Sequence, residues 1–236
     1  MPRRSILSIT ERENLLAFPE TMEELIRHYT FSEADLSIIR QHRGAANRLG
    51  FAVQLCYLRF PGIILGANEP PFPPLLNLVA EQLKVSIEVW DNYGQREQTR
   101  REHLIELQTV FRFQSFTMSH YRHNVHMLTE LAMQTDKGIV LANNMIEQLR
   151  CQLVILPSIN TIERAGAEAI TRANECIYEA LTHPLTDAHR QRLDNLLIRR
   201  DNSMITMLSW LRQSPAKPNS RYMLEHIERL QSLAGS

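Results

Sequence analysis

The sequence has little lysine, no surplus of either charge and no long apolar run. Among the 26 basic residues only Lys84, Lys137 and Lys217 are lysines, and the rest are arginines. Acidic residues also number 26, so the chain lacks the overall positive charge of many nucleic-acid-binding proteins. No apolar run is long enough to span a bilayer, and the start lacks the apolar core of a signal peptide. We therefore expect a cytoplasmic protein with no membrane partner.

Cysteine is also scarce. Cys56, Cys151 and Cys176 are odd in number, lie far apart and form no C-x-x-C pair. This spacing argues against a disulfide scaffold and against a zinc knuckle, while a single chance disulfide or free thiols stay open.

Catalytic motifs are missing as well. The sequence has no Gly-rich phosphate loop, no G-x-S-x-G and no H-E-x-x-H. His120, His123 and His126 are spaced by three, but on a helix the first and last diverge by about a third of a turn. No carboxylate or thiol lies close in sequence to complete a metal shell. We expect a polar helix face here, with phosphate contacts or a metal-dependent enzyme as alternatives, and we predict no catalytic residue, metal or cofactor.

Apolar residues recur at helical spacing, and no strand pattern exceeds a few residues. Capping boxes beginning at Ser8, Thr21 and Ser32 predict helices over 8–17, 21–29 and 32–41. Further helices are expected over 45–60, 75–84, from about 93, 117–136, 139–151, from 158, 186–211 and 222–233. The long one over 186–211 has a potential break at Asn202 and Ser203. The fold class is therefore all-α.

The helices divide into three expected regions. Two helical modules over 1–84 and 85–183 are followed by a helical extension over 184–236. The proline-dense stretch 70–74 cannot lie inside a helix or a central strand. It predicts an extended connector whose Phe72 packs against a neighbour, with a proline-motif ligand as the alternative.

The neutral total conceals basic windows. No acidic residue lies between Asp35 and Glu69, or between Glu106 and Glu130. From Arg190 to Arg221 the basic residues outnumber the acidic ones by seven to two.

The stretch from Tyr93 to Leu107 is polar and rich in hydrogen-bond donors at its start, and it becomes apolar at helical spacing toward its end. Asp91 or Asn92 is the expected N-cap. A DNA recognition helix divides its residues in the same way, with its N-terminal part on base edges. The alternative is an ordinary solvated helix face. The candidate contacts are Arg96, Gln98, Thr99, Arg100, Arg101 and His103.

Two helix pairs have the form of a helix-turn-helix, in which a short turn separates two helices. In the first, Gly44 precedes a second helix whose exposed candidates are Arg43, Asn47 and Arg48. In the second, over 139–181, the later helix begins with a capping box at Asn160 and Glu163. Its candidates for contacting DNA are Ser158, Asn160, Thr161 and Arg164. Any antiparallel helix pair gives a similar pattern.

Four stretches together resemble the N-terminal part of the transposases of the Tn-3 family of replicative transposons. They are 2–8 (PRRSILS), 40–61 (RQHRGAANRLGFAVQLCYLRFP), 92–107 (NYGQREQTRREHLIEL) and 155–164 (ILPSINTIER). The resemblance covers essentially the whole chain.

This resemblance implies an all-helical region that binds the double-stranded DNA of the terminal inverted repeats. It also implies that the metal-holding catalytic carboxylates belong to an RNase-H-like domain beyond residue 236. The chain would then be a truncated transposase or an excised N-terminal segment, associated with the bacterial nucleoid, that binds DNA and cuts nothing. The alternative function is a regulatory module whose helices over 186–233 mediate self-association or docking on full-length transposase.

Overall fold

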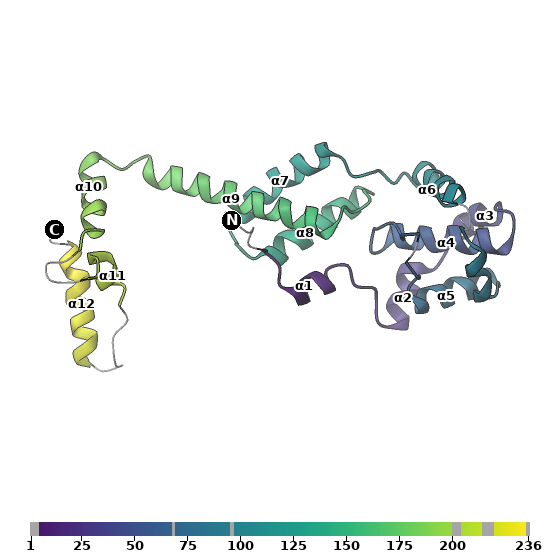
Figure 1. The fold of residues 1–236 in the computed structure, drawn as a ribbon, viewed down its shortest axis with the longest axis horizontal. Coiled ribbons are helices and arrows are strands. Elements are labelled where there is room, and N and C mark those ends of the chain that lie inside the picture. Colours follow the sequence, from purple (N-terminus) through teal and green to yellow (C-terminus); the bar gives the residue numbers. More distant parts are fainter. Residues whose placement is uncertain (1–4, 68, 95–96, 200–203, 214–219, 235–236) are drawn as a thin grey trace. The chain divides into compact units, whose positions relative to one another are not determined.

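The computed structural model describes residues 5–67, 69–94, 97–199, 204–213 and 220–234, and it contains no strand there beyond two isolated bridges. The all-α prediction is confirmed. The chain divides into two compact units, residues 1–175 and 176–236 (Figure 1). The described helices of the first unit, in chain order, are α1 (Ile9–Asn14), α2 (Met22–Tyr29), α3 (Glu33–Arg40), α4 (Ala45–Arg59), α5 (Pro73–Leu83), a 3-10 helix η1 (Ile87–Asn92), α6 (Glu97–Phe111), α7 (Met118–Ala132), α8 (Gly138–Cys151) and α9 (Ile159–Thr182). Helix α9 continues into the second unit.

The three expected N-terminal helices start where their caps predict. The side chains of Ser8 and Ser32 accept from the backbone amides of Glu11 and Asp35, and both capping boxes are complete. Thr21 accepts from the backbone amide of Glu24 in the same way. These bonds satisfy amides that have no partner inside the helix, so a three-residue pattern is enough to locate each start.

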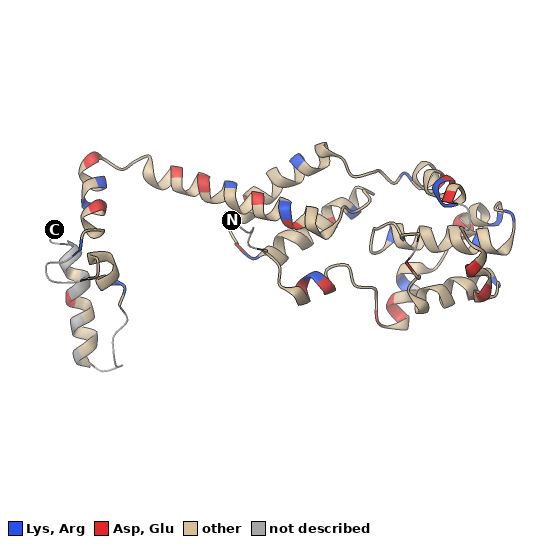
Figure 2. Cartoon of the chain, viewed as in Figure 1, with Lys and Arg blue, Asp and Glu red and all other residues tan. Residues whose placement is uncertain are grey.

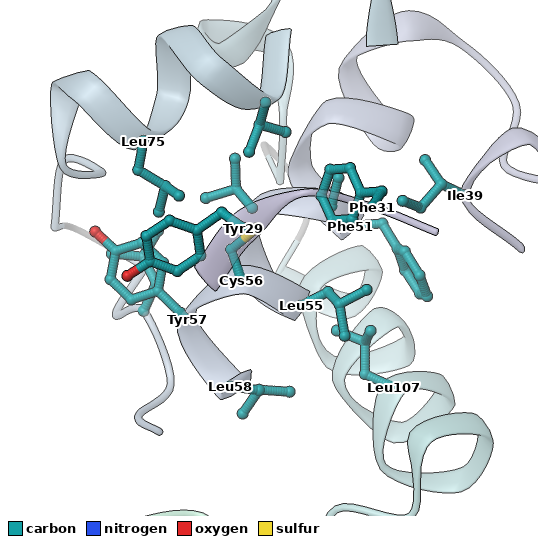
Figure 3. Packing of buried hydrophobic residues seen from close by; sticks show 14 of the residues in the cluster. Tyr29, Phe31, Ile39, Phe51, Leu55, Cys56, Tyr57, Leu58, Leu75 and Leu107 are labelled. Atoms are coloured by element: carbon teal, nitrogen blue, oxygen red, sulfur yellow. The ribbon is translucent and has the colours of Figure 1, made fainter. Parts of the chain in front are cut away.

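The first core surrounds α4, which contacts α2, α3, α5, α6 and η1. Every residue of α4 from Leu49 to Leu58 is buried, including the polar Gln54. Figure 3 shows Phe51, Leu55 and Leu58 of this helix among their neighbours. Helical spacing in the sequence does not indicate this burial, because it arises from the five elements that cover α4 on several sides. As a result, only the first turn of α4 is accessible for contacts with DNA, and the rest of this helix cannot act as a recognition helix.

The proline-dense connector packs as predicted. The Phe72 ring stacks on Phe18 with centroids 4.9 Å apart, and its backbone amide donates to the Tyr57 hydroxyl at 2.8 Å. Helix α5 starts at Pro73 instead of Leu75, because proline fits the first turn of a helix, where an amide would have no partner.

The second core is formed by α7, α8 and α9 together with the N-terminal segment. Leu7 and Leu15 are buried in it. Two glycines allow the N-terminal segment to pack directly against the helix backbones. A Cβ at Gly138 would collide with the backbone carbonyl of Ile6, and a Cβ at Gly166 would lie 2.6 Å from Cδ1 of Ile6. Apart from Ile155, the buried residues of the first core lie between Leu25 and Phe113, and this segment is inserted in the sequence between two parts of the second core.

This arrangement differs from the expected division at 84/85. Leu107 and Phe113, which follow that boundary, are buried in the first core. Arg150 of α8 joins the cores, because its Nε donates to the Pro61 carbonyl at 2.9 Å and its guanidinium lies 4.5 Å from the centre of the Phe60 ring. The compact unit also ends at Glu175, inside α9, instead of at residue 183.

The second unit contains α10 (Asp187–Leu196), α11 (Met207–Leu211) and α12 (Ser220–Ala234) after the end of α9. The single helix expected over 186–211 is wrong. Helix α10 ends at Leu196, a backbone bridge joins Arg199 to Thr206, and the Thr206 side chain caps α11. The expected break at 202–203 falls outside the described residues. Among the described residues of this unit only Leu211 is a buried apolar residue.

Candidate nucleic-acid interface

The turn between α3 and α4 exposes the first predicted group. Gly44 is the N-cap residue of α4 and has a positive φ of 81°, which glycine adopts without a steric cost. This conformation allows the chain to turn sharply into α4. Arg43 is exposed in this turn, and its backbone carbonyl accepts from Asn47 Nδ2 at 3.0 Å. Arg48 is half-buried, and its Nε is buried without a hydrogen-bond partner among the described residues. Arg43 therefore offers the freest cation of this group.

Helix α6 carries most of the second predicted group. Arg101 is exposed, and no carboxylate among the described residues pairs with it. Gln98 is exposed and donates to Glu102 of its own helix at 2.8 Å, while Thr99 is half-buried. Arg96 lies outside the described residues. The helix begins at Glu97, and Asp91 and Asn92 belong to η1, so the expected cap at those residues is wrong.

Arg100 does not project freely, which corrects the prediction for this residue. Its guanidinium donates to the backbone carbonyls of Gly66 and Ala67, each at 3.0 Å. It also lies 5.4 Å from the centre of the Tyr93 ring, a cation–π contact. Arg100 thus fastens the loop before α5 to the start of α6.

His103 is buried, with 6% of its surface exposed, so the expected DNA contact by this side chain is wrong in this conformation. Its Nδ1 lies 3.2 Å from the Tyr93 hydroxyl, and the two rings stack. Burial, and next the neighbouring His42, lower the pKa of His103 to about 4. The imidazole is therefore neutral at physiological pH and acts in packing.

His42 joins the turn to α6. Its ring lies 4.7 Å from that of His103 and 4.1 Å from that of Phe51, measured between centroids. Its Nε2 lies 3.5 Å from Oε1 of Glu106 on α6. Burial lowers the pKa of His42, and the Glu106 carboxylate opposes part of that effect. The contacts hold the α3–α4 turn against α6, so the structure brings together the two elements that carry the first two predicted groups.

The third predicted group lies in the second core, at the start of α9. Ser158 precedes the helix, and its hydroxyl lies 3.1 Å from that of Thr161. Asn160 accepts from Arg12 at 2.6 Å. The guanidinium of Arg164 lies 4.9 Å from the centre of the Tyr121 ring. The structure does not gather this group with the other two.

The expected capping box at Asn160 and Glu163 is also wrong. Glu163 pairs with Arg12 and accepts from the Ser5 hydroxyl at 2.6 Å. Both polar residues of α9 thus hold the N-terminal segment. No local pattern signals this role, because Arg12 and Glu163 are far apart in the sequence. Tyr93 and His42 likewise give no local signal in the sequence, because their function in joining elements depends on distant partners.

Other kinds of site find no support in the described part of the chain. No three His, Cys, Asp or Glu side chains are placed there to hold a metal ion. The three cysteines are free, with Cys56 buried. No described helix combines the length and the apolar character needed to cross a bilayer.

Comparison with known proteins identifies the family. A family model described as "Domain of unknown function (DUF4158)" matches residues 6–169. The transposase for transposon Tn3926 of Escherichia coli is 73% identical over 232 residues, which are 98% of this chain and 23% of that protein. The transposase for transposon Tn501 of Pseudomonas aeruginosa is 55% identical over 232 residues, 98% of this chain and 24% of its own length.

A more distant relative matches in the same way. The transposase for transposon Tn1546 of Enterococcus faecium is 33% identical over 234 residues, covering 98% of this chain and 24% of its own length. The chain thus spans about a quarter of the length of the curated relatives that it matches. The chain therefore belongs to the DUF4158 family, and its predicted resemblance to the transposases of the Tn-3 family is confirmed.

Proposed function

We propose that this chain binds double-stranded DNA, specifically the terminal inverted repeats of a Tn-3 family transposon, and that it contributes binding and no catalysis. Such a protein would act at the nucleoid. The observation that carries the proposal is the packing of the α3–α4 turn against α6 through His42 and His103. Each of these elements presents an exposed arginine, Arg43 and Arg101 respectively.

Arginine suits this role for two reasons. Its planar fork donates two parallel hydrogen bonds to guanine or to phosphate, and its charge does not depend on pH in the physiological range. The acid-free window after Asp35 includes the whole α3–α4 turn, so no carboxylate of that segment competes for Arg43. Rigid packing beneath the two elements limits the ordering that binding must impose, which favours affinity.

The first test compares single substitutions of two exposed arginines on different helices. Arg101→Ala should weaken binding to a terminal-repeat duplex about tenfold, because it removes one cation from the surface and little packing. Arg27→Ala, at an exposed arginine of α2, is the matched control and should bind as the wild type does. Fluorescence anisotropy with labelled duplexes measures both, and helical circular dichroism confirms that each variant is folded.

A scrambled duplex of equal length tests sequence specificity. The wild type should bind the terminal repeat more tightly than the scrambled duplex. Added salt should lower the affinity for each duplex strongly but change the ratio of the two affinities less, because phosphate contacts, which both duplexes offer, dominate the salt dependence. Equal affinity for both duplexes would refute the specific part of the proposal. Unchanged binding by the Arg101→Ala variant would refute the assignment of α6.

A second candidate function is protein interaction through the second unit. The observation in its favour is the set of large apolar side chains exposed there, each at 50% or more: Tyr178, Leu181, Leu193, Leu197, Ile198, Met204, Met223 and Leu224. Such surface normally pairs with another protein. In this case a second copy of the chain or full-length transposase would be the partner. Light scattering that shows self-association without DNA would favour this function, and a monomer at all concentrations would exclude self-association.

A further inference from the structure

Helix α7 has one face that the interface described above does not include. Ser119, Arg122, His123 and His126 are all exposed, and their spacing places them along one side of the helix. The opposite side, with Tyr121, Val125 and Leu128, is buried in the second core. We call the four exposed residues the α7 polar face.

The composition of this face is unusual for the molecule. Helix α9 carries both acidic and basic residues along its length, as Figure 2 shows, and Arg172 of that helix lies 2.7 Å from Glu168. The α7 polar face instead lies within the acid-free window between Glu106 and Glu130. Among the described residues no carboxylate pairs with Arg122. Glu130, which is exposed near the end of α7, is the first acidic residue that follows.

We propose that the α7 polar face binds the phosphate backbone of duplex DNA, independently of sequence. It would be a second contact surface, in addition to the one formed by the α3–α4 turn and α6. The inference rests on the proposed function. An arginine, two imidazoles and a hydroxyl all donate hydrogen bonds, and phosphate oxygens are acceptors that carry negative charge. The donors also begin at the helix N-terminus, where the helix dipole favours an anion.

The surface is supported rigidly. The Thr117 side chain caps α7 in a complete capping box with His120. The connector before it is fixed to the chain after α8, because the Gln114 amide donates to the Leu153 carbonyl at 2.8 Å and the Gln114 carbonyl accepts from Ile155 at 2.9 Å. A fixed donor array suits phosphates, whose spacing along the duplex is regular, and phosphate contacts set the register of a protein on DNA.

The test measures the affinity of the full chain for a labelled duplex of mixed sequence over a range of potassium chloride concentrations. The logarithm of the affinity falls linearly with the logarithm of salt, with a slope of about 0.9 for each phosphate neutralised. Arg122→Gln should reduce that slope by about one and weaken binding roughly fivefold at moderate salt. Adding His123→Gln and His126→Gln should weaken binding further.

Arg172→Gln is the matched control, since it removes the same charge from a guanidinium that already has a carboxylate partner. It should leave the salt slope unchanged. If the wild type binds the duplex and Arg122→Gln keeps its slope and affinity, the α7 inference is overturned while DNA binding stands. If the wild type binds no duplex at any salt concentration, both proposals are overturned. Unchanged circular dichroism in all variants ensures that the comparison concerns folded protein.

Discussion

His103 shows how one side chain can combine donor chemistry with a role in packing. It lies between Tyr93 and His42 and is 6% exposed, so its ring can reach neither solvent nor DNA in this conformation. Protonation would place a charge among these rings, and burial opposes that charge. The folded state therefore favours the neutral form of His103.

This leads to a prediction for acid stability. The folded state holds the pKa of His103 at about 4, whereas an unfolded chain returns it to about 6.5. The unfolded state therefore binds a proton first, and stability is lost as the pH falls from about 6.5 to about 4. His103→Asn should flatten this loss between pH 7 and pH 5, with a cost of about 1–2 kcal/mol at neutral pH for the packing removed.

Urea unfolding at several pH values measures the effect. His126→Asn, at an exposed histidine of α7, is the control and should show the pH dependence of the wild type. If His103→Asn retains that full pH dependence, the loss arises from other groups, such as His42.

At this scale the sequence predicted part of the candidate site. Arg43 and Arg101 are exposed as expected. Arg100 is held by carbonyls of Gly66 and Ala67, which lie more than thirty residues earlier in the chain. A run of polar residues shows which side chains can donate, but it does not show which acceptors the fold places beside them.

At the scale of the element, helix starts were predicted better than buried faces. The cap at Ser8 depends on a partner three residues away, so the sequence contains all of it. The burial of α4 depends on five other elements that cover it, and no local period reveals them. The end of α10 at Leu196, six residues before the potential break at Asn202, was not predicted, because Leu193, Leu197 and Met204 continue the helical spacing across it.

Gly138 provides a prediction for the N-terminal segment. An alanine there would bring its Cβ into the backbone carbonyl of Ile6, which has no freedom to rotate away as a side chain does. Gly138→Ala should displace this segment and destabilise the protein by about 1–3 kcal/mol, although alanine by itself favours a helix. Hydrogen exchange should then show faster exchange of the α1 amides.

Asn143→Ala, at an exposed position of the same helix, is the control and should preserve the protection of α1. Protection of α1 in the Gly138→Ala variant equal to that of the wild type would mean that Ile6 has another place to pack.

At the scale of the whole molecule, burial is distributed unequally between the two units. The first unit contains both apolar cores, while Leu211 is the only buried apolar residue among the described residues of the second. Local opening is easiest where few apolar contacts oppose it. The sequence predicted helices in both regions, but helical spacing alone does not tell how many neighbours a helix has.

We therefore expect hydrogen exchange to separate the units. Amides of α4 should exchange most slowly, at rates that approach those of global unfolding, and amides of α10, α11 and α12 should exchange much faster. Mass spectrometry of peptides from a timed exchange series measures both. Equal protection of α10 and α4 in dilute protein would contradict the expectation that the scarcity of buried apolar residues makes the second unit easy to open. Dilution removes self-association from the comparison.

The insertion of the first core into the second also orders events on the ribosome. The residues from Leu25 to Phe113 emerge and can collapse around α4 while α8 and α9 are still unmade. Ile6 meanwhile lacks the second of its two glycine contacts until Gly166 has been translated. At about 5–20 residues per second that delay lasts roughly ten to thirty seconds. Throughout this interval the segment around Ile6, which is translated first among the residues of the second core, has to wait for the residues of that core that are translated last.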